Sequence, residues 1–568
     1  MSEPGLSRKT TAGSSRRGAL HRIISGGHHI DDHSVYVNDQ DHDIEKANDV
    51  LADSDSEVSD REGEKEGEAV PEVRGGIPDV RDVEAADLQL QKTRSSRHAG
   101  DPNLVTWDGP DDPANPKNWK LKKKWAATLT VSSFTLISPV SSSMVAPALP
   151  TMAKQFGITS EVEEQLILSI FILAYAIGPL ILGPLSEIFG RVPVLQLSNL
   201  FYLAWNIGCS FAQNKQQMIA FRFLSGLGGS APLALGGGVL SDCWRAEERG
   251  KSISIYSLAP LLGPAIGPIA GGFITQNTTW RWAFWATSIA DAVIQLFGLF
   301  FLRETYAPKL LGQKAKRLRK ETGNMKLHTE YDNPDKTFGK LMRTSLIRPF
   351  RLLSTQPIVQ VLAIYMAYLY GLMYLVLSTF PTLWSEEYHE TIGVGGLNYV
   401  SLGLGFFLGT QICAPINDRI YRRLKKRNNG VGRPEFRVPL MFPGSALVPI
   451  GLFWYGWSAQ AHVHWIMPNI GATIFAAGII IGFQSMQTYI VDSYTRYAAS
   501  AVSATAFLRS LAGFGFPLFA PTMYKALHYG WGNSLLGFIA IFVGLPGPFM
   551  LWMYGEKLRA KSTYAAGP

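Results

Sequence analysis

Charged residues are scarce in this 568-residue chain. Asp, Glu, Lys and Arg make up 17% of it, while 46% of the residues are hydrophobic; an ordinary soluble chain is about 25% charged. Much of the charge is confined to residues 1–125 and to two segments near 304–351 and 417–437. A large soluble α-helical protein would need polar outer faces that the rest of the chain lacks. The scarcity of charge therefore argues for a membrane protein.

The chain also has few cysteines and lacks nucleotide-binding motifs. The three cysteines, Cys209, Cys243 and Cys413, fall at different depths or on different sides of a membrane protein, so no disulfide is implied. The chain contains no Gly-x-x-x-x-Gly-Lys-Ser/Thr loop and no Gly-x-Ser-x-Gly elbow, so nothing supports a primary pump or a membrane hydrolase. We expect no enzyme activity and no cofactor. No cleavable signal peptide is visible, since the first apolar block begins near residue 126.

Apolar blocks of about 20 residues occupy most of the chain, and each is long enough to cross a hydrocarbon layer about 30 Å thick. They predict an all-α membrane protein with twelve transmembrane helices in two six-helix halves. The first six blocks lie near 126–148, 165–186, 192–212, 216–241, 251–275 and 282–302. The second six lie near 356–380, 394–416, 438–459, 465–491, 499–523 and 531–555.

Lysine and arginine are distributed unevenly between the loops, which predicts cytoplasmic N- and C-termini. The predicted inner loops hold Arg191, Arg245, Arg249 and Lys251, twelve basic residues from Lys309 to Arg351, and eight from Arg419 to Arg437. The predicted outer loops hold few, among them Lys154, Lys215 and Arg281. The net charge of +8 is therefore a topology signal, and we expect no nucleic-acid partner. We expect the plasma membrane, with a vacuolar membrane as the alternative.

Composition divides the chain further. Residues 1–105 are too polar to fold and are predicted to be a disordered cytoplasmic tail; Ser54 and Ser59, each three residues before an acid, are candidate kinase sites. The run HHIDDH (28–33) we interpret as solvated polar residues, with no metal site. The remaining predicted segments are a linker (106–125), a first half (126–303), a cytoplasmic central loop (304–355), a second half (356–555) and a cytoplasmic C-terminal tail (556–568).

A short internal repeat supports two halves. LSEIFGR (185–191) follows the second block of the first half, and INDRIYR (416–422) follows the second block of the second half. Glu187 and Asp418 occupy the same place in the two copies. Matching loops in two six-span halves are typical of a parallel repeat.

The segment GPLSEIFGR (183–191) resembles the loop motif between spans two and three of the major facilitator superfamily. Its Gly183, Leu185, Ser186, Gly190 and Arg191 match the motif, whereas Glu187 stands in place of the usual Asp and Ile188 in place of the usual basic residue. The second copy keeps Asp418 and Arg419. The resemblance implies a conformational latch of carboxylates at helix termini, with Asp242 as the partner of Arg191. The alternative is plain stop-transfer charge.

Arg222 lies well inside the fourth block, where a charged side chain is costly and usually functional. Arg222 and Gly226 match the superfamily's span-four motif, and this resemblance implies a role in proton transfer. Because an arginine does not titrate at ordinary pH, a nearby acid or water must share that role. The alternative is a structural cation bonded to backbone carbonyls.

The stretch LGPAIGPIAGG (262–272) contains four glycines and two prolines in an apolar block. Glycines at every fourth position form one groove that lets another backbone approach closely: Gly263, Gly267 and Gly271. Gly267, Pro268, Gly271 and Gly272 also match the fifth-span motif of the superfamily's antiporters. The resemblance implies a tightly packed hinge, bent at Pro264 and Pro268, that seals the cavity against proton leak near the interface of the two halves.

More of the chain, about residues 105–560, resembles the fungal twelve-span drug:proton antiporters. The segments that carry this resemblance are DPANPKNW (112–119), WRWAFW (280–285), ETYAP (304–308), RPEFRVP (433–439) and YAASAVSATAFLRS (497–510). It implies a proton-coupled exporter of lipophilic drugs, fungicides or toxic metabolites, working in the bilayer as a monomer on small molecules and protons. The alternatives are a self-made metabolite or a polyamine as cargo, a facilitator or importer of the same fold, and a sensor that signals through the tail.

Drug-export cavities combine aromatic walls with a few polar groups. The candidate cavity residues are Tyr175, Met366, Tyr370, Tyr374, Gln484, Gln487, Asp291 and Arg509, and packing is the alternative for each. Asp291 would attract a cation if it faced the cavity; otherwise it is a buried acid bonded to a neighbour. Asn277 begins a glycosylation sequon in a predicted outer loop.

Overall fold

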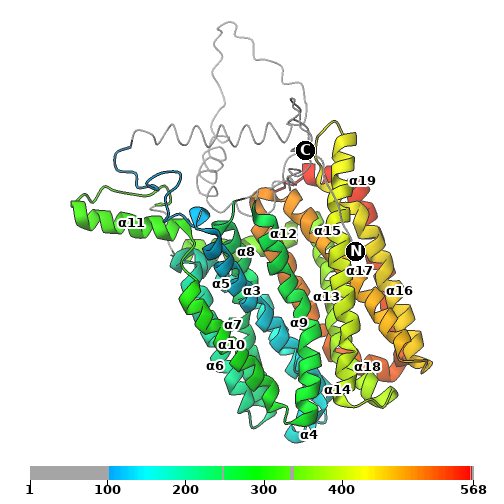
Figure 1. Ribbon diagram of the computed structural model, residues 1–568. Coiled ribbons are helices and arrows are strands. Elements are labelled where there is room, and N and C mark those ends of the chain that lie inside the picture. The colour runs from blue at the N-terminus through cyan, green and yellow to red at the C-terminus, as the bar shows by residue number, and fades with distance from the viewer. Residues whose placement is uncertain (1–100, 246–247, 333–337, 563, 566–568) are drawn as a thin grey trace, which may run out of the picture.

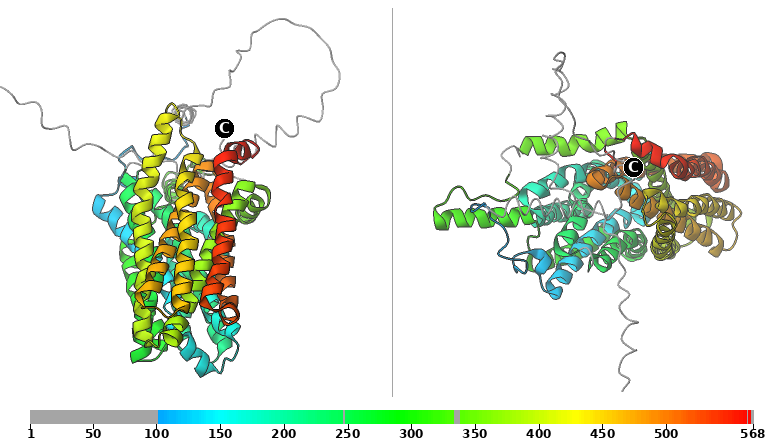
Figure 2. Two further views of the ribbon diagram at one scale, coloured as in Figure 1. Left: turned by 90° about the vertical axis from the view of Figure 1, so that its right-hand side faces the viewer. Right: turned by 90° about the horizontal axis from the view of Figure 1, so that it is seen from above.

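The computed structural model describes residues 101–562 and 564–565, apart from 246–247 and 333–337. The predicted tail, with Ser54, Ser59 and the HHIDDH run, lies outside the described residues. The described chain is helical throughout and contains no strand beyond one isolated bridge between Leu104 and His328. The long helices stand side by side as a bundle (Figures 1 and 2). The all-α class predicted from the sequence is confirmed.

The first half contributes six spans, two of which are interrupted where glycine or proline occurs. The helix α3 is followed by the short turn η2 and helix α4, and α7 is followed directly by α8. The bounds are α3 Leu121–Ser143, η2 Ala146–Ala148, α4 Leu149–Phe156, α5 Glu161–Phe189, α6 Arg191–Ser210, α7 Lys215–Gly229, α8 Ala231–Cys243, α9 Arg249–Asn277 and α10 Arg281–Phe301.

The second half repeats this pattern, with an α-helix broken near one end in its first two spans. The bounds are α13 Pro357–Thr382, η4 Leu383–Glu387, α14 Ile392–Leu397, α15 Tyr399–Arg427, η5 Pro434–Leu440, α16 Met441–Gln460, α17 Ile466–Ser493, η6 Thr495–Tyr497, α18 Ala498–Gly544 and α19 Pro546–Ala560.

Ten helical stretches of the described chain are long and apolar enough to cross a membrane. The last of them, Ala498–Ala560, contains two spans, because the backbone breaks at His528 (φ 55°, ψ 177°). The twelfth span is α6, whose mean hydropathy is lowered by the buried polar residues Gln196, Asn199 and Asn206. The structure therefore agrees with the twelve spans predicted from the apolar blocks.

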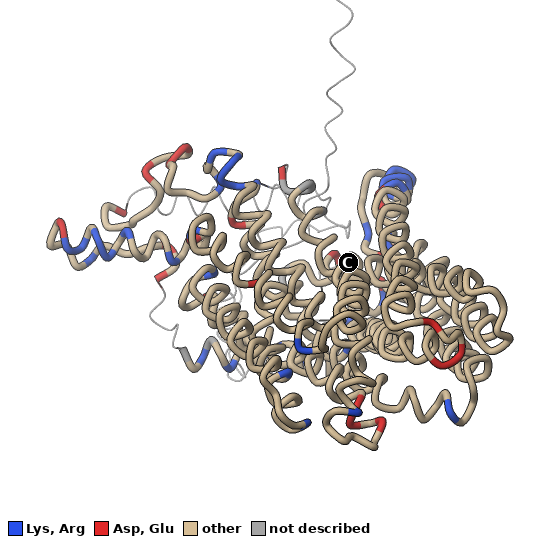
Figure 3. Tube along the Cα trace, turned by 60° about the horizontal axis from the view of Figure 1, so that its bottom comes forward, with Lys and Arg blue, Asp and Glu red and all other residues tan. Residues whose placement is uncertain are grey.

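The segment between the two halves, predicted as a loop, contains two helices: α11 (Ala307–Thr322) and α12 (Phe338–Thr355). In α11 the apolar positions Leu311 and Ala315 lie four residues apart and are buried, so one face of this otherwise basic helix packs inward. Both helices lie at one end of the bundle, together with the start of α3 and the C-terminal end (Figure 1). Lys and Arg gather on α11 and on the end of α15 (Figure 3). We call this end the basic end.

The DPANPKNW segment folds back on itself at the basic end. Backbone N–H groups of Asp108 and Ala114 donate to the Asp112 carboxylate, and these hydrogen bonds lower the pKa of Asp112 below its ordinary value. The Asn118 amide donates to the Pro110 carbonyl over 2.7 Å, and Asn118 accepts from Arg245 after α8 over 2.9 Å. The linker is thus tied to the end of the fourth span.

The two halves meet on two sides of the bundle. On one side α5 of the first half packs against α18 of the second, and on the other α9 packs against α14 and α15. At the end of the bundle opposite the basic end, the Gly393 N–H donates to the Gln276 side chain over 2.7 Å, and Lys525 forms an ion pair with Glu161. The halves are therefore joined at the end opposite the basic end.

The glycine groove predicted in 262–272 packs against α3. A Cβ atom on Gly263 would lie 2.5 Å from that of Pro139, one on Gly267 would lie 2.7 Å from the Val140 carbonyl oxygen, and one on Gly271 would overlap the Met144 carbonyl. The helix α9 continues through its three prolines. Small residues thus allow two backbones in the same half to touch.

This packing predicts that Gly271→Ala destabilises the protein. The added methyl group overlaps a backbone carbonyl that cannot rotate away, and such overpacking costs about 1–3 kcal/mol. We expect a lower midpoint of thermal unfolding for the protein purified in detergent. Gly515→Ala is the matched control, because a Cβ at Gly515 in α18 meets no atom within 4 Å. Equal midpoints for the two variants would contradict the packing argument.

Candidate functional site: a central cavity and the helix ends around it

A cavity of about 460 Å³ lies between the two halves and extends from the basic end into the bundle. Its walls come from α5, α8, α9, α12, α17 and α18. At the basic end it is bordered by Glu187 and Arg191 from the first half and by Arg348 of α12. The deepest described lining residue on α18 is Ser510. At the opposite end of the bundle the two halves are joined by the Gly393–Gln276 and Lys525–Glu161 contacts, whereas the described cavity lining reaches the basic end.

Three of the candidate cavity residues line this cavity: Tyr175, Gln487 and Arg509. Tyr370 and Tyr374 lie directly behind Arg509. Their ring centroids are 5.0 Å apart, and the Arg509 guanidinium carbon lies 5.3 Å from the Tyr370 ring centroid. These aromatic residues therefore form the layer next to the cavity wall, although they do not line it.

Met366, Gln484 and Asp291 do not line the cavity. Met366 is buried in the core of the second half, one turn from Tyr370 on α13. Asp291 is fully buried against α6, where the Asn199 amide lies 3.0 and 3.1 Å from its two carboxylate oxygens. The prediction of Asp291 as a cavity acid is therefore wrong, and its alternative, a buried acid bonded to a neighbour, describes the geometry. The sequence pattern placed these residues at the right depth in the membrane. It could not predict whether their side of the helix faces the cavity or a neighbouring helix.

Arg222 is fully buried and donates to three backbone carbonyls. The acceptors are Ser141 at 3.0 Å, Ser142 at 3.1 Å and Ile167 at 3.3 Å. Because α3 ends at Ser143, the carbonyls of its last turn have no helical partner. Arg222 supplies that partner, and its positive charge suits a helix C-terminus. The geometry is that of the carbonyl-bonded alternative, and it gives Arg222 a definite structural role, because the guanidinium holds the break in the first span.

The break held by Arg222 also touches the second half. The Ser142 hydroxyl lies 3.4 Å from the Tyr374 hydroxyl of α13, and the Ser138 hydroxyl lies 2.5 Å from that of Tyr175. Polar contacts therefore connect Arg222, through α3, to residues on both sides of the cavity.

The predicted pair at the loop motif is present. The Nε atom of Arg191, at the start of α6, lies 3.7 Å from the Asp242 carboxylate near the end of α8. Arg191 also donates to the Ser186 hydroxyl over 2.7 Å. Glu187 lies near the end of α5, before the break at Gly190, and borders the cavity. The ends of spans two, three and four are thus bound together at the mouth of the cavity.

In the second half an ion-pair cluster occupies the corresponding place, and it does not include the motif residue Arg419. Asp418 pairs with Arg437 at 2.9 Å, and Arg437 pairs also with Asp492 at 3.0 Å. Arg419, the residue matched to the motif, is exposed, and no described carboxylate pairs with it. Arg437 begins span nine and Asp492 ends span ten, so this pair occupies the same place as Arg191 and Asp242 do in the first half. Sequence reasoning missed both residues.

Two further carboxylates at the basic end were also missed, although they lie in segments singled out as typical. Glu304 of ETYAP accepts from the backbone N–H of Arg191 over 3.1 Å and so caps the start of α6. Glu435 of RPEFRVP is buried and bonds Arg559 of α19 through both carboxylate oxygens, at 3.0 and 2.9 Å. The sequence feature that could have identified both residues is a carboxylate in a proline-containing segment at the end of a span.

The remaining residues of the fifth-span motif lie at the seam between the halves. A Cβ on Gly272 would lie 2.8 Å from the Ile392 carbonyl of α14, and one on Gly396 would lie 3.1 Å from the Pro268 carbonyl. The other face of α9 holds α3, so one helix touches both halves. Asn277, at the end of α9, is exposed at the end opposite the basic end.

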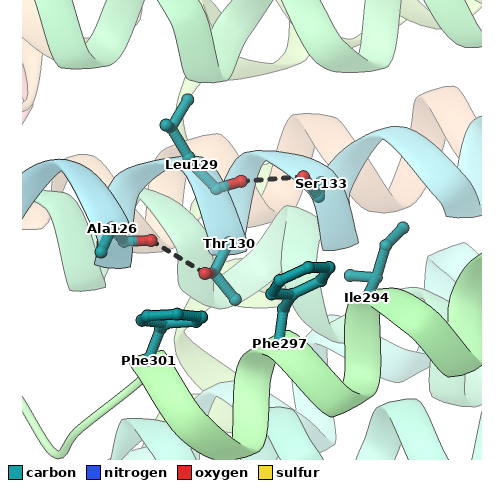
Figure 4. Close-up of a pocket in the computed structure, with 7 residues that line it drawn as sticks. All are labelled: Ala126, Leu129, Thr130, Ser133, Ile294, Phe297 and Phe301. Carbon is teal, nitrogen blue, oxygen red and sulfur yellow. Dashed lines mark hydrogen bonds between the residues drawn. The ribbon is translucent and has the colours of Figure 1, made fainter.

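A second hollow, of about 250 Å³, lies between α3 and α10 (Figure 4). It is lined by Ala126, Leu129, Thr130, Ser133, Ile294, Phe297 and Phe301. Thr130 and Ser133 turn their hydroxyls to the carbonyls of Ala126 and Leu129 on their own helix. Leu129 and Phe297 are about half exposed. This hollow is a groove on the outer, apolar surface and has no unbonded polar group to orient a cargo.

The family model described as Major Facilitator Superfamily matches residues 131–517. The chain belongs to the major facilitator superfamily. The family consists of transporters of small molecules, often coupled to protons, and not of enzymes. Efflux pump vrtL of Penicillium aethiopicum is 55% identical over 90% of this chain and 99% of that protein. Efflux pump radE of Floropilus chiversii is 43% identical over 84% of this chain and 88% of that protein.

Solved structures show the same fold. The xylose transporter XylE from E. coli, in a partially occluded inward open conformation, aligns with a TM-score of 0.55 and 16% identity over 76% of this chain and 98% of that one. A bacterial homologue of the lysosomal transporter Spinster aligns with a TM-score of 0.54 and 15% identity over 78% of this chain and 93% of that one. At this identity the likeness concerns the fold alone.

The helix-end pairs predict unequal effects of two arginines. Arg437→Gln removes the guanidinium that bonds Asp492, a mostly buried carboxylate; hydrogen bonds to charged groups contribute about 1.5–3 kcal/mol. We expect a midpoint of thermal unfolding several degrees lower. Arg419→Gln removes the same charge from an exposed site, where substitutions change stability by less than about 0.5 kcal/mol, and its midpoint should stay near that of the unmodified protein. A larger fall for Arg419→Gln would reverse the assignment.

Proposed function

We propose that the protein is a proton-coupled exporter that removes toxic compounds or secondary metabolites from the cell. The observation that carries the proposal is the 55% identity, over nearly the full length of both chains, to a protein named as an efflux pump. The antiporter-type glycine motif supports it, because this motif seals α9 against α3 on one face and against α14 on the other.

The orientation belongs to the same proposal. Basic residues collect at cytoplasmic loops, so we place the basic end in the cytoplasm and the multi-pass chain in the plasma membrane. The cavity then faces the cytoplasm, and cargo enters it from inside the cell. Asn277 would face the outside, where its sequon is open to glycosylation. We further propose a monomer, and kinases as partners of Ser54 and Ser59.

Coupling requires contacts that exist in only one of two conformations. We assign this role to the two equivalent pairs, Arg191 with Asp242 and Arg437 with Asp492, because both join span ends beside the open cavity. In the opposite conformation these ends would separate. Arg222 contributes by fixing the broken end of α3, which contacts both sides of the cavity.

The proposal predicts that cargo entry into inside-out vesicles dissipates an inwardly acid pH gradient. The vesicles come from a host without its own exporters and have an acidified lumen. Azoles, polyamines and fungal toxins are added outside, and lumenal pH is recorded. We expect decay of the gradient with the accepted compounds. The Lys side chain of Arg222→Lys lacks the planar guanidinium that bonds three carbonyls at once. We expect this variant to dissipate the gradient at least about tenfold more slowly, which corresponds to a barrier about 1.4 kcal/mol higher.

Two results separate the alternatives. Equilibration of a labelled compound with no change in lumenal pH would make the protein a facilitator and contradict proton coupling. Removal of residues 1–100 tests the sensor alternative, since an exporter should continue to move its cargo without the tail. Arg419→Gln serves as a charge-matched control in both measurements.

A further inference from the structure

Arg509 of α18 differs from every other described arginine at membrane depth. It lines the cavity, yet no described carboxylate lies within 4 Å of it, and its buried Nε atom has no hydrogen-bond acceptor. Its nearest partners are aromatic rings: the guanidinium carbon lies 5.3 Å from the Tyr370 ring centroid and 5.0 Å from that of Phe483. These rings stabilise a cation without neutralising it.

Arg222 shows what a structural arginine looks like in the same bundle. It is bonded to three carbonyls, lies outside the cavity lining and completes a helix end. Arg509 completes nothing comparable in the described chain. A cation at membrane depth is costly, so it faces a cavity or pathway where a partner arrives. The geometry therefore calls for a negative group that is brought into the cavity.

The rest of the cavity agrees with this sign. Its charged lining residues are Glu187, Arg191, Arg348 and Arg509. Because Arg191 is already paired with Asp242, Arg509 sets the sign of the charge at depth. Glu187 lies at the mouth, near the end of α5. The acid that would have favoured a cationic cargo, Asp291, is buried against α6 and does not line the cavity. The neutral polar groups of the lining include the Gln487 amide and the hydroxyls of Ser503 and Ser510.

We propose that Arg509 is the anion-binding residue of the cavity and that the cargo is a planar aromatic acid, ionised as a carboxylate or an acidic phenol. This inference rests on the proposed function and names its substrate class. The guanidinium fork binds a carboxylate through two parallel N–H groups. Tyr175 and Tyr256 supply aromatic surface in the cavity lining, against which a flat ring system packs. Tyr370 and Phe483 lie behind the lining and hold the guanidinium in place.

The test uses three probes of one ring system: anthracene-9-carboxylate, its methyl ester and 9-(aminomethyl)anthracene. Dissociation constants are measured on the full chain in lipid nanodiscs. We expect the acid to bind at least about tenfold more tightly than the ester and the amine to bind weakest. Arg509→Gln should lower the affinity for the acid about tenfold and leave that for the ester nearly unchanged, while Arg509→Lys should retain part of the preference. Arg419→Gln removes the same charge outside the cavity and should change none of the three constants.

Three outcomes would overturn the inference: no binding of the acid to the unmodified protein, equal or tighter binding of the ester or amine, or an equal loss of all three probes in Arg509→Gln. If that variant fails to fold, the order of the three probes on the unmodified protein still decides. The vesicle assay keeps the two proposals apart. If the acid binds in an Arg509-dependent way but no protons move, the proposal of a proton-coupled exporter is refuted and the anion site remains supported. If all three probes drive proton movement equally, the anion site is refuted and the exporter remains supported.

Discussion

A charged side chain buried in a membrane protein must find its partners within the protein, and Arg222 meets this constraint by completing the broken end of α3. The break frees the carbonyls of Ser141 and Ser142, and the guanidinium donates the hydrogen bonds that a further helical turn would have supplied. Since α3 also packs against the glycine face of α9 and touches Tyr374 of the other half, the position of this one helix end fixes the first half and its seam with the second.

The seam shows how the same fifth-span motif serves two interfaces. Glycines four residues apart bring α9 into contact with the backbone of α3, and the adjacent Gly272 brings the opposite face against Ile392 of α14. Close backbone contact stands in for the hydrophobic driving force that is missing between helices in lipid. A bulkier face on α9 would hold the halves apart at the end opposite the cavity mouth. The packing of the α9 glycines against α3 and α14 therefore keeps the two halves together at the end opposite the cavity mouth.

The fold and the ends of the spans followed from the sequence because hydropathy and charge act along the chain. Hydropathy located the twelve spans, and the position of Arg191 at one span end and Asp242 at another was enough to pair them. Rotation about a helix axis is a different matter. Asp291 and Arg509 are both single charges in apolar helices, yet one is turned toward α6 and the other toward the cavity. The motif directed attention to Arg419, and Arg437 was missed because the 3₁₀ helix η5, which places Arg437 against Asp492, leaves no periodic signal.

The sign of the cavity also bears on energetics. Each pH unit supplies about 1.4 kcal/mol per proton, and each 100 mV supplies about 2.3 kcal/mol per charge moved. Exchange of one proton for one monovalent cation moves no net charge and gains nothing from the membrane potential. Exchange of one proton for one monovalent anion moves two positive charges inward, so that 100 mV contributes about 4.6 kcal/mol. A cationic site such as Arg509 selects the cargo for which an inside-negative membrane gives the strongest drive, and the charge of the cavity and the direction of transport then reinforce each other.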